Sequence, residues 1–181
     1  EDIQADGNNR TGVQIDARYA GGVIENLSLQ NVRASSNTEQ GVRVFALNDG
    51  RIVNLSLQDI TTTGNTSYGT EVYAETSALI DNVSLQDITA TGNAASGVYV
   101  FARTGGQIAQ TSLQDVTSTN NIGYGVYVNA TNAGSSLNNL TANNITANTN
   151  TLTGVLVSSS NSGSMTGLDI NNITATGNTQ Y

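Results

Sequence analysis

Hydrophobic residues recur along this chain in a pattern that repeats six times. Each copy opens on Gly-Val-x-Val or a close variant, and successive opening glycines are 28 or 29 residues apart: Gly12, Gly41, Gly69, Gly97, Gly125 and Gly154. Each copy closes on an asparagine: Asn37, Asn65, Asn93, Asn121, Asn150 and Asn178. A fixed period of this length predicts one supersecondary unit stacked on itself, each copy burying its apolar side against the next.

Within the copy that begins at Gly97, valines alternate with aromatic residues over 98–102, which predicts a strand with one buried side. A turn is expected at 103–106, because it contains two glycines. A second apolar segment follows at 108–113, and a third at 116–119 after the polar pair 114–115. The pattern therefore predicts three short strands per coil, separated by corners, with no helical period anywhere.

Stacked coils place equivalent side chains above one another, about 4.8 Å apart. One inward column consists of Ile60, Ile88, Val116, Ile145 and Ile173. The closing asparagines form a second column without exception. Their amides can hydrogen-bond from coil to coil, so we predict an asparagine ladder at an inward corner.

The Gly-Val-x-Val strand, the Leu-Gln-Asp-Ile corner at 57–60 and the asparagine column resemble the right-handed parallel β-helix superfamily, which has the pectin-lyase-like fold. The resemblance implies an all-β solenoid of about six coils, forming a single domain over residues 1–181. A leucine-rich repeat is the structural alternative, but Ile60 stands where that pattern requires asparagine. The superfamily includes lyases, hydrolases, epimerases, adhesins and inert scaffolds, so the fold alone does not give the function.

The composition excludes several classes of function. The net charge is −8, and the six arginines are scattered, which argues against a nucleic-acid partner. No apolar run approaches the ~18 residues of a membrane helix, so membrane insertion is not expected. Histidine, cysteine, proline and lysine are absent, which removes the commonest general base and metal ligands. Richness in Asn, Thr, Ser and Gly is typical of a secreted or cell-surface protein.

The enzymes that the resemblance suggests use motifs that this chain lacks, because Gly-His-Gly and Asp-Pro-His both require histidine. Arg43 faces Glu71 of the next coil, where we expect an exposed ion pair of small energetic worth. Glu71 and Glu75 lie four residues apart in one strand. We therefore predict a protein that is not an enzyme, with a polysaccharide lyase or hydrolase as a remaining alternative.

Asp59, Asp87 and Asp115 form a column at the Gln-Asp corner. Three carboxylates at strand spacing could bind calcium. The alternative is that each corner needs a residue that tolerates left-handed dihedrals, which Asp and Asn both do. The second interpretation is favoured, so no cofactor is predicted.

Outward positions of the first strand carry aromatic residues. The alternation predicts that these side chains point to solvent and form a face for sugar or protein contact: Phe45, Tyr73, Tyr99, Phe101 and Tyr127. Tyr68 and Tyr124 precede the strand in two copies. The alternative is that stacked rings only stabilise adjacent strands.

The third strand carries outward Thr-x-Thr pairs in most copies. They predict a flat lattice with about 7 Å along the strand and about 4.8 Å between coils. This lattice resembles insect-type ice-binding proteins, although Thr is also a common exposed strand residue. The residues are Thr61, Thr63, Thr89, Thr91, Thr117, Thr119, Thr174 and Thr176.

Both ends of the repeat array lack an obvious amphipathic cap. We expect either a piece of a longer repetitive protein or a subunit that stacks end to end on itself and forms filaments. The sequence thus favours a non-catalytic extracellular solenoid that serves as a structural and adhesive module. The expected partner is another copy of the same chain, stacked end to end, or a carbohydrate or other partner at the cell surface.

Overall fold

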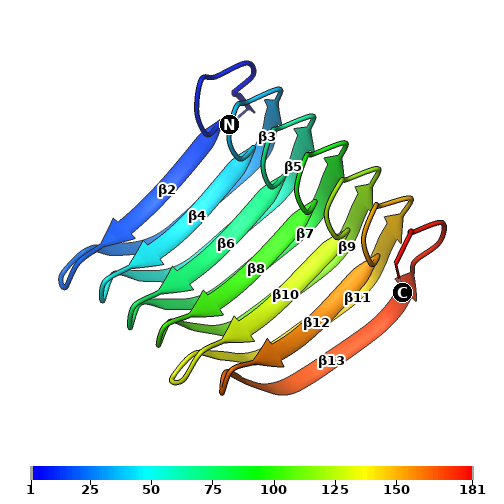
Figure 1. Cartoon of the computed structure of the whole chain (residues 1–181). Coiled ribbons are helices and arrows are strands. Elements are labelled where there is room, and N and C mark those ends of the chain that lie inside the picture. The colour runs from blue at the N-terminus through cyan, green and yellow to red at the C-terminus, as the bar shows by residue number, and fades with distance from the viewer. Residues whose placement is uncertain (1, 181) are drawn as a thin grey trace.

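The computed structural model describes residues 2–180, which form thirteen β-strands and no helix (Figure 1). Because no helix is present among them, the described residues provide no membrane-spanning helix. Six short strands are β2 (Val13–Arg18), β4 (Val42–Leu47), β6 (Thr70–Glu75), β8 (Val98–Arg103), β10 (Val126–Thr131) and β12 (Val155–Ser160). The long strands are β3 (Val23–Ser35), β5 (Arg51–Thr63), β7 (Leu79–Thr91), β9 (Gln107–Thr119), β11 (Ser136–Asn148) and β13 (Ser164–Thr174), preceded by the two-residue β1 (Ile3–Gln4).

The strands form two parallel sheets that run the length of the molecule (Figure 1). One sheet has the order β1-β3-β5-β7-β9-β11-β13, and the other has the order β2-β4-β6-β8-β10-β12. Each strand pairs with its equivalent in the adjacent coils, so that Val98 pairs with Thr70 on one side and Val126 on the other. This topology confirms the predicted all-β parallel β-helix of about six coils.

The number of strands per coil differs from the predicted three. The second and third predicted strands form one long strand, as β9 does in place of 108–113 and 116–119. Asp115 bends this strand with a φ of 54°, but the residues on either side of it, Gln114 and Val116, still pair with β7. Since the equivalent residue is left-handed in every coil, the bends stack and one sheet continues around the corner.

The core lies between the two sheets and consists of the inward columns of the repeat. Ile60, Ile88 and Val116 are fully buried, as are Val72 and Val100 on the facing sheet. Burying a side chain of this size contributes about 1.5–3 kcal/mol relative to leaving it exposed. The period-2 alternation of the sequence therefore sets which side of each strand faces inward.

The closing asparagines form a ladder in the turns that follow the long strands. The backbone N–H and the Nδ2 of Asn65 both donate to Oδ1 of Asn93, at 3.1 and 2.9 Å. Asn93 repeats the same pair of bonds to Asn121. The ladder runs from Asn8 to Asn178. It fixes the register of neighbouring coils, because a shift of one residue would leave these buried amides without partners.

Candidate functional site

The aromatic side chains lie on the outer side of the short-strand sheet, as their alternation with the core valines requires. Their expected exposure is wrong, however: Phe45 is 2% exposed, and Tyr73 and Tyr99 are each 8% exposed. Phe101 and Tyr127 are half-buried. The alternation gives the direction of a side chain, but neighbours on the same side of the sheet decide how much water reaches it.

These neighbours are mainly other rings, which stack from coil to coil and, for Tyr99 and Phe101, along one strand. The ring of Tyr99 lies 5.2 Å from that of Tyr127 and 5.1 Å from that of Phe101, with interplanar angles of 25° and 23°. Tyr73 and Phe101 stack at 5.6 Å, and Tyr68 stacks on Tyr99 at 4.5 Å. Because each ring turns a face to another ring, the stack presents mostly ring edges to solvent.

A hollow of about 260 Å³ opens on this side of the sheet, where Glu71 precedes Tyr99 and Tyr127 in one column of paired residues. Its lining consists of Arg43, Tyr68, Glu71, Tyr73, Tyr99, Phe101 and Arg103. We call these seven residues the outer hollow. Three predicted aromatic residues therefore meet in one place, together with Tyr68 and three charged residues.

Glu71 is the most buried charged group of the outer hollow, at 5% exposure. Its Oε2 lies 2.9 Å from Nε of Arg43, as an ion pair and not as an aligned hydrogen bond. Gln40 donates from Nε2 to the same oxygen at 3.1 Å. Burial raises the pKa of Glu71, while Arg43 and Gln40 act in the opposite direction. The expected exposed pair is thus a largely buried one.

A second ion pair lies at the edge of the outer hollow. Nε of Arg103 lies 2.7 Å from Oε1 of Glu75, and the hydroxyl of Tyr73 donates to Oε2 of the same carboxylate. Burial alone would raise the pKa of Glu75, but these two hydrogen bonds lower it below its usual range. Burial and the Glu75 carboxylate raise the pKa of the Tyr73 phenol. Arg103 also lies over the Tyr73 ring, 5.6 Å from its centre.

Phe45 lies outside the outer hollow, under two arginines. The guanidinium carbons of Arg18 and Arg43 lie 4.8 and 4.3 Å from the centre of its ring. Cation–π contacts of this kind are attractive and cover the ring face. Phe45 therefore stabilises the sheet, while Tyr127 extends the ring stack beyond the outer hollow in the other direction.

The Thr-x-Thr pairs occupy the outer side of the long-strand sheet, near the ends of its strands. Thr61, Thr89 and Thr117 pair in register, and so do Thr63, Thr91 and Thr119. Most of these side chains are exposed, and Thr91 and Thr119 are half-buried with their hydroxyl oxygens 3.4 Å apart. Thr174 continues the first column through Thr146, and Thr176 bonds to Asn148 in the second. The result is two parallel columns of hydroxyl and methyl groups, which we call the threonine face.

The aspartate column occupies the corner of the long strands. Asp59, Asp87 and Asp115 each have a φ of 54°, and the asparagines at the equivalent positions have similar values. Asp115 accepts hydrogen bonds from Asn144 and Gln114, which lower its pKa. Among residues 2–180, no three His, Cys, Asp or Glu side chains are grouped as a metal site would require. The left-handed backbone accounts for the residue type at this corner.

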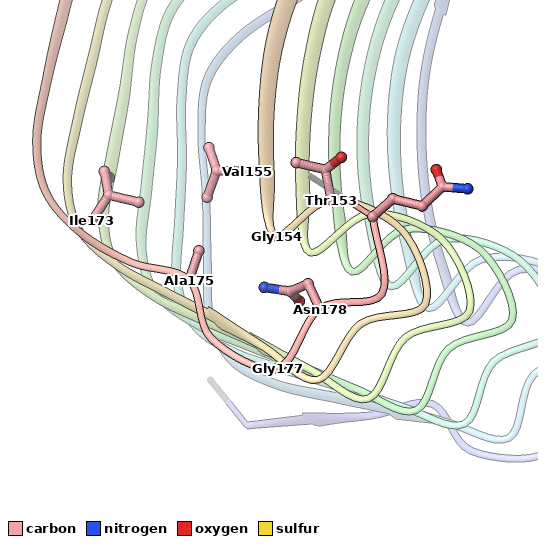
Figure 2. A pocket seen from close by; sticks show the side chains of 8 residues that line it. Thr153, Gly154, Val155, Ile173, Ala175, Gly177 and Asn178 are labelled. Carbon is pink, nitrogen blue, oxygen red and sulfur yellow. The ribbon is translucent and has the colours of Figure 1, made fainter.

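A second hollow, also of about 260 Å³, opens at the C-terminal end of the coil (Figure 2). Val155, Ile173 and Ala175 face the interior there, next to Asn178 of the ladder. Leu168 and Ile170 of β13 are 44% and 39% exposed, although their partners in β11, Leu140 and Ala142, are buried. The last described coil therefore exposes a cross-section of the core.

Sequence reasoning identified Arg43, Glu71, Glu75 and the rings one by one but did not assemble the outer hollow. It missed the contact from Gln40 to Glu71 and the pairing of Arg103 with Glu75. The repeat could have predicted the pairing of Arg103 with Glu75, since Arg103 follows Glu75 by one period of 28 residues. The two residues are paired across β6 and β8.

No protein-family model matches the chain, and no curated protein matches its sequence. Among solved structures, the chain is similar to the A-module of the mannuronan C-5 epimerase AlgE4 from Azotobacter vinelandii, with 14% identity and a TM-score of 0.48. This similarity covers 94% of the chain and 61% of the module, so the chain spans less than two thirds of that structure. HetL, a pentapeptide repeat protein from Nostoc sp. strain PCC 7120, matches with 12% identity and a TM-score of 0.20, over 95% of this chain and 86% of that one. Neither similarity carries an argument about activity.

Proposed function

We propose that this protein is a non-catalytic module of a secreted or cell-surface protein that binds carbohydrate in the outer hollow. The observation that carries the proposal is the lining itself: four aromatic rings, one buried carboxylate and two guanidinium groups around about 260 Å³. Small-molecule sites are usually concave and combine aromatic side chains with a few placed polar groups. The outer hollow has both, although polar groups make up more of its lining than is usual. Sugars match it, because they present both C–H surfaces and hydroxyl groups.

The size of the outer hollow supports binding of a part of a glycan chain. Pockets that enclose a drug-sized ligand measure about 300–1,000 Å³, and this one is smaller. One sugar ring could enter while the rest of the chain follows the outer side of the sheet. Contact would come from ring edges, phenol hydroxyls and planar charged groups, since the ring faces are occupied by stacking.

The contacts of the two carboxylates support binding without catalysis, because each carboxylate is occupied by an arginine and a second donor. Glycoside hydrolysis needs one carboxyl group that donates a proton and a second that acts as base or nucleophile. Glu75 is held ionised by Tyr73 and Arg103, and Glu71 is engaged by Arg43 and Gln40. The chain has no histidine that could replace either of them.

A matched pair of variants tests this proposal. Tyr68 and Tyr124 occupy equivalent positions two coils apart, and each contacts one tyrosine ring. Tyr68 stacks on Tyr99 at 4.5 Å, and Tyr124 lies tilted by 41° against Tyr127 at 4.6 Å. Only Tyr68 lines the outer hollow. A glycan array followed by calorimetry should show that Tyr68→Ser weakens carbohydrate binding about tenfold or more, while Tyr124→Ser retains it. Equal losses in both variants, or no binding by the unaltered protein, would reject the proposal.

Ice binding on the threonine face is a second candidate, supported by the in-register exposed columns of Thr61, Thr89 and Thr117. A rigid sheet that repeats hydroxyl and methyl groups at about 4.8 Å could order water in a matching lattice. Thr89→Tyr should then abolish thermal hysteresis, while Ser112→Tyr, on the same sheet outside the threonine face, should not. Absence of hysteresis in the unaltered protein would end this candidate.

Self-association through the coil ends is the other interaction that we propose, supported by the exposed apolar side chains of Leu168 and Ile170. Exposed apolar surface next to unpaired strand edges favours stacking of another solenoid end. Leu168→Glu should reduce any concentration-dependent assembly seen by analytical ultracentrifugation. A purely monomeric protein at high concentration would contradict it.

A further inference from the structure

The two arginines of the outer hollow are both neutralised from within the protein. Arg43 lies 2.9 Å from Glu71, and Arg103 lies 2.7 Å from Glu75. Gln40 and Tyr73 add a further donor to each carboxylate. The two positive charges of the lining are therefore matched by Glu71, which belongs to the lining, and by Glu75, which lies just outside it.

This pairing penalises a ligand that carries a carboxylate. An acidic sugar would have to displace Glu71 or Glu75 from its arginine, or bring a third negative charge within a few ångströms of both. Like charges at such distances repel, more strongly where burial excludes water, as it does around Glu71. The overall net charge of −8 adds to the repulsion.

A positively charged sugar is also penalised, because its ammonium group would face the guanidinium groups of Arg43 and Arg103. An uncharged sugar avoids both costs. Its hydroxyls can donate to the carboxylate oxygens and accept from the guanidinium and phenol groups, without breaking either ion pair.

We propose that the outer hollow selects uncharged sugar residues and that Glu71 is its specificity-determining residue. This inference rests on the carbohydrate-binding function proposed above and names its ligand class. Glu71 excludes acidic sugars by occupying Arg43, so removal of its charge should release a guanidinium for a sugar carboxylate. Glu75 plays the same part for Arg103 at the more exposed edge.

The test compares neutral gluco-oligosaccharides with oligoglucuronates of the same length and linkage, by calorimetry at low salt. The unaltered protein should bind the neutral series at least about tenfold more tightly. Glu71→Gln should shift the ratio of the two affinities by about tenfold or more towards the oligoglucuronates, since Arg43 loses its partner. Glu25→Gln, which removes the same charge at an exposed position of β3, should leave the ratio unchanged.

The outcomes separate the two proposals. Equal or tighter binding of the oligoglucuronates by the unaltered protein overturns the selectivity but leaves carbohydrate binding intact. An unchanged ratio in Glu71→Gln overturns the role of Glu71. Absence of binding to both series and to the glycan array overturns the proposed function and this inference together. If Glu71→Gln does not fold, as judged by circular dichroism, Glu75→Gln gives the same readout through Arg103.

Discussion

The amide of Asn93 donates to Oδ1 of Asn121, one coil further along the axis, at 3.0 Å, and the backbone N–H of Asn93 donates to the same oxygen at 2.9 Å. Asn93 also accepts two bonds from Asn65 and is fully buried. One side chain therefore joins three consecutive coils, which explains why no other residue type occupies this column.

Asn93→Ala should be among the most destabilising single substitutions in the chain. It removes the acceptor for two buried N–H groups of Asn65 and the donor to Asn121. A loss of about 3–5 kcal/mol in the free energy of unfolding is expected, because each buried group left without a partner costs about 1–3 kcal/mol. Urea denaturation measures it, with Asn9→Ala at an exposed position as control. Similar losses in both variants would show that the ladder does not contribute more to the free energy of unfolding than an exposed asparagine does.

Thr70→Val should stabilise the protein. The Thr70 hydroxyl is buried without a hydrogen-bond partner among the described residues, in a column where the neighbours are Val42 and Val98. Replacing it by a methyl group of the same shape should add about 1 kcal/mol to the free energy of unfolding. Exposed Thr61→Val serves as control and should change little. A destabilised Thr70→Val would mean that an ordered water bonds the hydroxyl.

Asp87→Ala should cost about 1 kcal/mol, because alanine is strained at a φ of 54°. Asp87→Asn should be nearly neutral, since asparagine occupies the same corner at Asn31 and Asn144. Calcium should leave the melting temperature of the unaltered protein unchanged. A calcium-dependent rise that Asp87→Asn removes would instead identify the aspartate column as a metal site.

The buried Glu71 carboxyl should make a distinct contribution to the pH dependence of stability. Burial raises its pKa above the ordinary value of 4.5, so the folded state keeps this proton to a higher pH than the unfolded chain. The contribution is complete below pH 4.5 and is lost as the pH rises through the folded pKa. Relative to Glu71→Gln, the unaltered protein should therefore lose stability as the pH rises above 4.5 and through the folded pKa of Glu71. Parallel curves over this range would show that the carboxyl titrates normally in the fold.

The period of the sequence was sufficient to predict the stacking, the inward columns and the register. Like residues such as Ile60 and Ile88 pair because any other register would bury polar side chains. The number of strands was not predictable in this way. Whether a left-handed residue such as Asp59 ends a strand or bends it depends on the pairing of its neighbours, which no local pattern contains.

The site was predictable only in part, for a related reason. The alternation of residues placed Phe45 and Tyr99 on the outer side of the sheet. It could not show that Arg18 covers the ring of Phe45 or that other rings cover Tyr99. The ion pair between Arg43 and Glu71 followed from the period. The burial of this ion pair did not follow from the period, because it depends on contacts among side chains from several coils.

Amide chemical-shift mapping during titration with a neutral oligosaccharide would locate the binding surface, since it reports on the outer hollow, the threonine face and the coil ends at once. We expect saturable shifts centred on Glu71, Tyr73 and Tyr99, with the threonine face and the coil ends unaffected. Shifts confined to the threonine face or to the coil ends, or no shifts at all, would contradict it.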